Sequence, residues 1–293
     1  MTVARSEPEI TTVRSGRFTL RLPRTESTLD QDQEWFEVEY EGERRRMRIH
    51  DYAGLYSVPD LYEAVVYDRL RCASPPRIVN LLTSVLADWP TDAAHLRVLD
   101  LGAGNGIVAS ELKGAGVREI VGLDLIPEAE RAARRDHPEA YRDYVVADLT
   151  DLSEDDHRRL RERRLNCLAV VAALGFGDIP PDAFANAVNL LLPEGWLGIT
   201  IKETFLSPDD DSGFACLMRA MINDRIIDVQ AHQRYCHRVS LSGDKLFYYA
   251  IVGRKLRDVP DSLVKDAIEG RRRESIKARD GAGLLLGGEA PDA

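Results

Sequence analysis

One stretch, Val98 to Gly106, constrains the fold more than any other part of the chain. It reads V-L-D-L-G-A-G-N-G, an apolar run that ends in three glycines at alternate positions. Such a run is typical of a strand buried on both faces, as the strands of parallel sheets are. The glycines allow a sharp turn and let the backbone approach a ligand closely. Apolar residues at helical spacing follow from Ile107 to Leu112, so we expect a strand, a ligand-binding loop and the N-terminus of a helix.

The spacing of the glycines separates two classes of nucleotide-binding loop. A dinucleotide-binding loop has the pattern G-x-G-x-x-G, and its third glycine would fall at Ile107. This chain has G-x-G-x-G instead, and Asp100 adds a carboxylate that would repel a pyrophosphate and attract an ammonium group. The stretch therefore resembles motif I of the class I S-adenosylmethionine (SAM) methyltransferases. The alternative is a glycine-rich turn without a ligand. The resemblance implies that SAM is the cofactor and that the loop residues bind it: Asp100, Gly102, Ala103, Gly104 and Gly106.

The same resemblance implies the fold. Besides the strand before the glycine loop, apolar segments indicate strands at residues 119–125, 144–149, 167–174, 196–205, 226–238 and 245–255. In this family such strands form a Rossmann-like seven-stranded sheet in a three-layer α/β/α arrangement, in the order 3-2-1-4-5-7-6, with the last strand antiparallel. We expect an N-terminal extension with a β-hairpin over residues 1–48, a methyltransferase domain over residues 49–257 whose residues 49–90 form a helical lid, and a helix with a disordered tail over residues 258–293.

Two acidic residues follow the second and third strands of this predicted sheet. Asp124 lies 20 residues after Gly104, a place from which a carboxylate reaches the ribose hydroxyls of an adenosine. Leu125 and Ile126 are then expected to face the adenine. The resemblance implies that Asp148 contacts the adenine amino group, with Leu149 beside the ring. A turn or helix-capping role is the alternative for Asp148.

The N-terminal part of the chain is predicted to lie outside this sheet. Residues 1–16 are polar and without periodicity, so we expect them to be poorly ordered. Alternating apolar residues predict a short strand over residues 18–22 and a hairpin over residues 36–49. The second strand of the hairpin carries Arg44, Arg45, Arg46 and Arg48. These arginines could pair with Glu37 and Glu39 on the opposite strand, bind an anionic substrate, or pack in a homodimer.

Between His50 and Trp89 the pattern becomes helical and predicts two helices before the sheet. This segment holds four tyrosines, which is many for an ordinary core segment, because each buried hydroxyl needs a partner. The sequence D-Y-A-G-L-Y resembles the lid that folds over the cofactor in small-molecule methyltransferases. The resemblance implies that Tyr52 contacts the methionine end of SAM and that Tyr56 lies on the substrate side. Tyrosines packed against the first helix of the sheet are the alternative.

The loop after the fourth strand is expected to cross the reacting face. Ala172 and the two residues after it match the segment that passes under the methionine moiety in the family. Many relatives place histidines in the following loop, whereas this chain has Phe176 and Asp178. We expect Phe176 to be an apolar wall for the substrate and Asp178 to be a polar contact, with helix capping as the alternative for Asp178.

Methyl transfer from SAM needs a general base only for some acceptors. The weak candidates are His50 beside the lid, His232 and His237 on the sixth strand, and Glu203 at the end of the fifth strand. A solvated or core position is the alternative for each histidine. The catalytic residue is therefore left open.

Composition limits the remaining choices. The net charge of −10 argues against a broad nucleic-acid surface. The four cysteines have no metal-ligand spacing, and no apolar run reaches the ~20 residues of a membrane span. We expect a cytoplasmic protein without a metal that methylates an oxygen, nitrogen or carbon atom of a small molecule, in specialised metabolism. The alternatives are a protein or RNA methyltransferase, a non-catalytic SAM-binding protein and a nicotinamide-dependent oxidoreductase.

Overall fold

A seven-stranded sheet forms the centre of the molecule. The computed structural model describes residues 10–14, 16–23, 33–174, 179–207, 210 and 212–269. Its central strands are β5 (Arg97–Leu101), β6 (Glu119–Asp124), β7 (Asp143–Val146), β8 (Cys167–Leu174), β9 (Trp196–Lys202), β10 (Ile227–Val239) and β11 (Lys245–Lys255). They lie in the order β10-β11-β9-β8-β5-β6-β7, and β11 runs antiparallel to both of its neighbours. Read from β5 as the first strand, this is 3-2-1-4-5-7-6, so the predicted fold class and strand order are confirmed.

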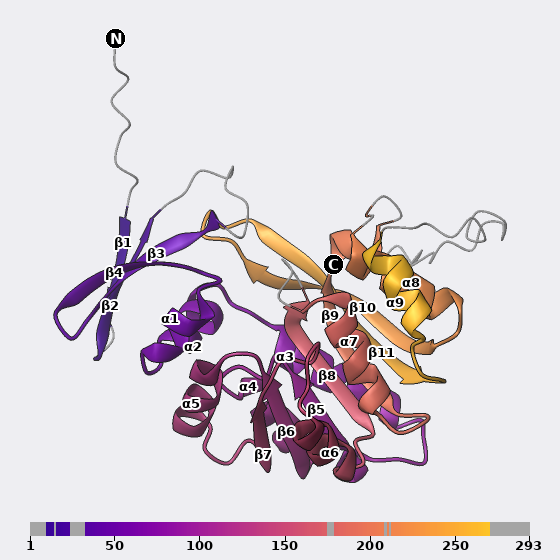
Figure 1. The fold of residues 1–293 in the computed structure, drawn as a ribbon. Coiled ribbons are helices and arrows are strands. Elements are labelled where there is room, and N and C mark those ends of the chain that lie inside the picture. The colour runs from indigo at the N-terminus through magenta and orange to yellow at the C-terminus, as the bar shows by residue number, and fades with distance from the viewer. Residues whose placement is uncertain are drawn as a thin grey trace.

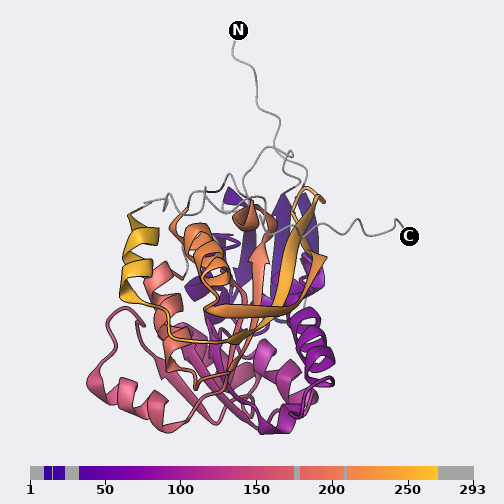
Figure 2. The same ribbon diagram turned by 90° about the vertical axis from the view of Figure 1, so that its right-hand side faces the viewer.

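Helices cover both faces of this sheet because its strands are apolar on both sides. The helices are α3 (Ser74–Leu86), α4 (Ile107–Gly114), α5 (Pro127–Asp136), α6 (Glu154–Glu162), α7 (Pro181–Leu190), α8 (Gly213–Asn223) and α9 (Asp261–Ile268), with short 3₁₀ turns at η3 (Ala93–His95) and η4 (Glu203–Leu206). One buried cluster joins α3 and α4 to the sheet, and a second joins α6 to α9 to its other face. The view in Figure 2 shows α3 on one side of the strands and α7 to α9 on the other. The result is the predicted three-layer arrangement.

The N-terminal extension is an antiparallel sheet of its own. Its strands are β1 (Ile10–Arg14), β2 (Phe18–Pro23), β3 (Trp35–Tyr40) and β4 (Glu43–Arg48), in that order across the sheet. The predicted hairpin is β3 with β4, and the predicted strand over residues 18–22 is β2. The prediction of disorder up to residue 16 is wrong for β1, because β2 offers this segment a free edge with which it pairs in register.

The arginines of β4 mostly have partners within this sheet. Arg44 donates to the carboxylate of Glu37 from the neighbouring strand, at 2.8 Å through Nε, which is the predicted cross-strand pairing. Arg45 pairs with Glu43 on its own strand. The guanidinium of Arg46 stacks on the ring of Trp35, 3.3 Å from its centroid.

The predicted lid consists of short helices that share a core with the N-terminal sheet. They are α1 (Tyr52–Ser57), α2 (Leu61–Glu63) and η2 (Ala64–Arg69), of which η2 is a turn of π-helix, followed by α3. Phe36 and Leu20 of the sheet pack with Leu55, Leu61 and Val65 of the lid in one fully buried cluster. Figure 1 shows the indigo strands and α1 side by side, next to the central sheet. The lid therefore packs against the N-terminal sheet as well as lying next to the central sheet.

A buried ion pair connects the N-terminal sheet to the long hairpin of β10 and β11. Glu34, just before β3, accepts a hydrogen bond of 2.8 Å from Arg238 of β10, and both side chains are almost fully buried. The second carboxylate oxygen of Glu34 accepts from the backbone N–H of Leu241. Figure 1 shows this hairpin reaching from the central sheet to the N-terminal sheet, where Glu34 precedes the first residue of β3. In the part of the chain that the structure describes, no helix has the length and apolarity to cross a membrane.

Candidate functional site

The glycine loop lies at the carboxyl end of β5, where the sheet order changes direction. Gly102, Gly104 and Gly106 all have positive φ, at 70°, 53° and 96°, so other residues would be strained there. A Cβ built on Gly102 would lie 2.7 Å from Cβ of Ala173 at the end of β8. The loop leads directly into α4, so its N–H groups lie at a helix N-terminus, and the strand edge beside it is where open α/β sheets bind ligands.

Asp124 ends β6 beside this loop. Its Oδ2 accepts a hydrogen bond of 2.9 Å from the N–H of Gly104, and its Oδ1 accepts one of 3.2 Å from the N–H of Ile126. Burial raises the pKa of Asp124, while these backbone hydrogen bonds lower it. Each carboxylate oxygen keeps a further lone pair. The two backbone donors thus fix the carboxylate and leave it able to accept two hydroxyl donors of a ligand.

Asp100 lies deeper in the site than Asp124. Its side chain is 1% exposed, and its Oδ2 accepts a hydrogen bond of 2.8 Å from the hydroxyl of Tyr141. Its Oδ1 is buried and has no hydrogen-bond partner among the described residues. Burial raises the pKa of Asp100 to about 8, the Tyr141 hydroxyl opposes this shift, and the charge of Asp124 adds to it. A cationic group close to Asp100 would favour its ionised form.

Two exposed apolar side chains lie beside Asp124 at the same edge of the sheet. Leu125 is 61% exposed, and Val146, which is the register partner of Asp124 on β7, is 36% exposed. A flat, apolar ring that covered Leu125 and Val146 would remove their apolar area from water. The prediction for Leu125 is compatible with this surface, whereas Val146 was not singled out from the sequence. Leu149 is buried, and it belongs to the apolar cluster between the central sheet and α6 to α9.

Asp148 is exposed and has local partners. Its Oδ1 accepts from the backbone N–H of Thr150 at 2.8 Å and from the hydroxyl of Thr150 at 2.7 Å. The hydroxyl bond, followed by the backbone bond, lowers the pKa of Asp148. This is the turn geometry named as the alternative, and Oδ2 stays accessible, so the contact with adenine remains a prediction.

The lid tyrosines reach the glycine loop. A Cβ built on Gly104 would lie 2.5 Å from Oη of Tyr56, so the hydroxyl lies directly on the loop. The ring of Tyr56 is stacked near Tyr52, with centroids 6.2 Å apart, and is tilted against Tyr62 at 4.9 Å. Burial raises the pKa of Tyr56 well above its usual value. A neutral hydroxyl on α1 therefore faces the place where a ligand of the loop would lie, and Tyr52 lies next to it.

Several residues that support the loop carry no signal in the sequence. Asn105 of the loop donates to Glu63 of the lid at 2.7 Å, and the same carboxylate oxygen is 2.9 Å from Nε2 of His137 at the end of α5. The hydrogen bond with His137 lowers the pKa of Glu63. Tyr144 of β7 donates to the carbonyl of Gly104 at 2.9 Å. These contacts join residues between 40 and 74 positions apart, and no local pattern predicts them.

The end of β8 brings Ala172 to the same edge. Ala172 has φ of 56°, which is unusual for a residue with a side chain, and its N–H donates to Oγ1 of Thr200 on β9 at 2.7 Å. The pairing of β8 with β9 is interrupted between Val170 and Leu174. Phe176 and Asp178, the predicted substrate contacts, lie outside the described residues.

The candidate general bases occupy four different environments. His50 lies next to the lid, with its ring 6.0 Å from that of Tyr52. His232 is exposed on β10. Glu203 accepts both hydrogen bonds of a bidentate pair with Arg234, at 2.9 and 3.1 Å.

His237 is the buried member of the candidate bases. It is 6% exposed, and its Nδ1 lies 2.6 Å from the hydroxyl of Ser74. Burial lowers the pKa of His237 to about 3, and the charges of Arg238 and His50 lower it further. None of these four environments identifies a base that is in contact with the glycine loop.

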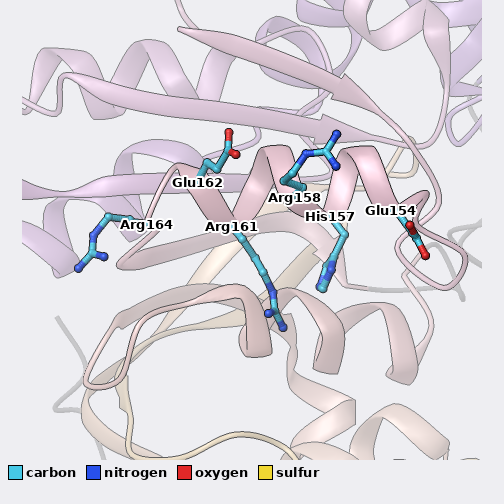
Figure 3. A pocket seen from close by; sticks show the side chains of 6 residues that line it. All are labelled: Glu154, His157, Arg158, Arg161, Glu162 and Arg164. Atoms are coloured by element: carbon cyan, nitrogen blue, oxygen red, sulfur yellow. The ribbon is translucent and has the colours of Figure 1, made fainter.

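Two cavities are lined by residues outside the glycine loop. One, of about 680 Å³, is lined by α6 and the residues after it: Glu154, His157, Arg158, Arg161, Glu162 and Arg164. Figure 3 shows His157 and Arg161 pointing to one side of the helix and Arg158 and Glu162 to the other. The second, of about 510 Å³, lies over Trp35 and Arg46 on the N-terminal sheet. Among the residues that the structure describes, no group of acidic, histidine or cysteine side chains could hold a metal.

The residues at the sheet edge fit a ligand that joins an adenosine to a cation. The glycine loop lies against the hydroxyl of Tyr56, so closely that a Cβ on Gly104 would lie 2.5 Å from it. Asp124 offers acceptors for two hydroxyls beside the apolar pair Leu125 and Val146, and Asp100 holds a buried carboxyl oxygen without a partner in the described structure. A pyrophosphate would meet two carboxyl groups here and would be repelled by their ionised forms.

Comparison with known proteins gives a match over this same region. A family model described as "Methyltransferase domain" matches residues 99–199, which include the loop, Asp124 and Ala172. Uncharacterized methyltransferases of Mycobacterium tuberculosis and Mycobacterium bovis are each 29% identical to the chain over 133 residues, 45% of this chain and 47% of theirs. The chain thus spans about half the length of these relatives.

Methyltransferases are among the solved structures that are similar to the chain. The N-methyltransferase NodS of Bradyrhizobium japonicum, in complex with S-adenosyl-L-homocysteine (SAH), is 13% identical with a TM-score of 0.45, over 71% of this chain and 98% of that chain. The 1,6-didemethyltoxoflavin-N1-methyltransferase of Burkholderia thailandensis is 17% identical with a TM-score of 0.42, over 86% of this chain and all of that chain.

Proposed function

We propose, on the premise that residues 99–199 form a class I SAM-dependent methyltransferase domain, that this chain transfers the methyl group of SAM to a small-molecule acceptor. The accepting atom is an oxygen or a nitrogen, or else a carbon. We place the acceptor in specialised metabolism. The alternatives are a protein or RNA acceptor and a SAM-binding protein without catalysis.

One observation carries the cofactor assignment. Asp124 is fixed by two backbone donors beside the glycine loop, with exposed Leu125 and Val146 next to it. In this place the carboxylate would accept hydrogen bonds from the two ribose hydroxyls, and the apolar pair would cover the adenine. Asp100, with its unpartnered oxygen, would lie near the ammonium group.

The remaining residues would act by position. Bound SAM supplies a methyl group that is already activated on a sulfonium. The protein therefore needs to hold the accepting atom in line and to exclude water, and such positioning can be worth effective molarities of about 10⁵ M or more. Tyr56 of the lid lies on the loop, with the ring of Tyr52 6.2 Å from its own, and would exclude water from this region. A base is needed only for an acceptor that must lose its proton before transfer.

Two features favour a small acceptor over RNA. The net charge of −10 disfavours a polyanion such as RNA. The end of β8, with Ala172, Ala173 and Leu174, is apolar, whereas an extruded base needs hydrogen bonds to its polar edge. These observations support a small-molecule acceptor over RNA, and the labelling experiment below separates it from a protein acceptor.

The first experiment is calorimetric titration of the full chain with SAH, SAM and NADH. We expect micromolar or tighter binding of SAH and SAM and none of NADH. Asp124→Asn should weaken SAH binding by about 10-fold or more, because it replaces a charged acceptor. Asp155→Asn, at an exposed position on α6, is the matched control. Binding of NADH without SAH would refute the proposal.

The second experiment follows tritium from methyl-labelled SAM. The protein is incubated separately with a small-molecule extract, with total protein and with total RNA from the source cells. We expect label in the small-molecule fraction. Label in protein or RNA would overturn the acceptor class, and SAH binding without label in any fraction would favour the non-catalytic alternative.

A further inference from the structure

A row of buried polar side chains runs from the end of β8 toward the lid. The N–H of Ala172 donates to Oγ1 of Thr200 at 2.7 Å, and the Thr200 side chain also acts on the hydroxyl of Tyr235, whose pKa burial raises and this contact lowers. The Tyr235 hydroxyl lies 2.6 Å from Oγ of Ser74, which lies 2.6 Å from Nδ1 of His237. We call Thr200, Tyr235, Ser74 and His237 the relay. It joins β8, β9, β10 and the first residue of α3.

The relay is shielded from water along its length. Thr200 and Ser74 are 0% exposed, Tyr235 is 5% and His237 is 6% exposed. Buried polar groups that lack a partner are costly, and here each group has one within the row. The ring of His237 is stacked on that of Tyr248 at 4.0 Å. The relay is therefore a built arrangement, and its members depend on each other.

One order of donors and acceptors along the relay starts from the backbone N–H of Ala172. A backbone N–H can only donate, so the Thr200 hydroxyl accepts from Ala172 and can pass its own proton on to Tyr235. In this order Tyr235 would donate to Ser74, and Ser74 would donate to Nδ1 of His237, at the 2.6 Å that separates each pair. This order requires a neutral His237 with its proton on Nε2. Burial lowers the pKa of His237 to about 3, which agrees with a neutral ring.

The end of the relay supports the part of the site next to the glycine loop. Ala173 packs against Gly102 of the glycine loop. A Cβ built on Gly102 would lie only 2.7 Å from the Cβ of Ala173. With the ribose on Asp124 of β6, as proposed above, the rest of the cofactor would extend over β5 and β8. Ala172 adopts its left-handed φ of 56° at this place. Such a conformation persists only when the surroundings determine it.

We propose that the relay is a positioning device for the methionine end of the cofactor, which holds Ala172 in its left-handed conformation so that the end of β8 stays against the glycine loop. This inference rests on the proposed function. Thr200, Tyr235, Ser74 and His237 act through the backbone of Ala172 and are positioning residues.

The test compares two ligands that differ only in the part that would lie over β8. SAH carries the homocysteine moiety, and adenosine lacks it. In Thr200→Val and Tyr235→Phe, which remove a hydroxyl and keep the shape, SAH should bind about 3- to 10-fold more weakly, because a buried hydrogen bond is lost. Adenosine binding should stay unchanged. Thr200→Ser, which keeps the hydroxyl, should restore SAH affinity, and Tyr249→Phe on β11 is the matched tyrosine control.

A second measurement follows the relay itself. Nitrogen-15 spectra of the histidines should show His237 as the Nε2–H form in the wild type from pH 5 to pH 9, and Ser74→Ala should abolish this fixed tautomer. Amide exchange at Ala172 should become faster in Thr200→Val and not in Thr200→Ser.

Each outcome decides between the possibilities. Equal weakening of SAH and adenosine would mean a general loss of structure and would overturn the inference, as would unchanged SAH affinity in both hydroxyl-removing variants. Failure of the wild type to bind SAH at all would overturn the proposed function and this inference with it. Normal wild-type binding with no effect in the variants would overturn the inference alone.

Discussion

Asp100 and Asp124 are the same residue type at the ends of adjacent strands, but their surroundings give them different chemistry. Asp124 is fixed by the N–H groups of Gly104 and Ile126 and can accept further hydrogen bonds. Asp100 is buried with one oxygen unpartnered in the described structure, and burial raises its pKa to about 8. The first carboxylate is thus ready to bind hydroxyls, and the second is a protonated group at neutral pH until a cation approaches.

The raised pKa of Asp100 makes stability depend on pH. Its usual value is 3.8 and its value in the folded protein is about 8. Between these values the folded state binds the proton more tightly than the unfolded state, so stability falls as pH rises through this window. Asp100→Asn cannot ionise, so it should become progressively more stable than the wild type from about pH 4 to pH 8, with a constant difference above pH 8. Urea unfolding at a series of pH values measures this, and parallel curves would contradict it.

Gly104 can be tested by adding one methyl group. The Cβ of Gly104→Ala would lie 2.5 Å from Oη of Tyr56, at a φ of 53°. We expect a loss of stability of about 1–2 kcal/mol from the backbone conformation alone, and SAH binding at least 10-fold weaker. Gly114→Ala in α4, where nothing lies within 4 Å, should instead stabilise by about 0.5–1 kcal/mol. Thermal unfolding and calorimetry compare the two, and unchanged SAH binding in Gly104→Ala would refute the place of Gly104 in the binding site.

The sequence predicts the parts of the site that come from a local pattern. Gly104 and Asp124 follow apolar strands at a fixed spacing, and their contact at 2.9 Å needs only adjacent parallel strands. Glu63 and His137 meet only because the lid folds onto α5, and no periodicity carries that information. Val146 reads as an ordinary strand residue, and its exposure is visible only once β7 lies at the edge of the sheet.

At the scale of elements, the buried pair Glu34–Arg238 ties the N-terminal sheet to β10. Removal of one partner leaves an uncompensated buried charge, so Glu34→Ala should destabilise the protein by about 3–5 kcal/mol. Glu128→Ala, which breaks the more exposed pair with Arg131 on α5, should cost less than about 0.5 kcal/mol. Chemical denaturation of both variants measures the difference. Similar small costs would mean that the N-terminal sheet is held mainly by its apolar contacts.

The elements of the central sheet were predictable because each is a buried strand followed by a turn or a capped helix. β1 was not, because residues 10–14 look polar and gain a partner only from the edge of β2. The shared core of the lid and the N-terminal sheet was also not predictable. Alternating residues such as Phe36 and Val38 indicate a buried face, but they do not say that the lid helices cover it.

At the scale of the whole molecule, cofactor binding should couple to folding. A ligand that binds only the folded state stabilises it by about 2.7 kcal/mol at a hundred times its dissociation constant. The melting temperature should therefore rise with the logarithm of the SAH concentration. Asp124→Asn should need a higher SAH concentration for the same rise. For each protein, the rise is measured from the melting temperature of that protein without ligand. A constant melting temperature in the presence of SAH would contradict specific binding.

The position of Tyr56 has a consequence for the rate at which a ligand enters. Its hydroxyl lies on Gly104, so α1 has to move away before the loop can be reached from that side. If this opening limits entry, the observed association rate should level off at high ligand concentration instead of rising in proportion to it. The limiting rate, measured by stopped-flow fluorescence, would then be the rate of lid opening. Tyr56→Ala should raise this limiting rate, because it removes the side chain that covers Gly104.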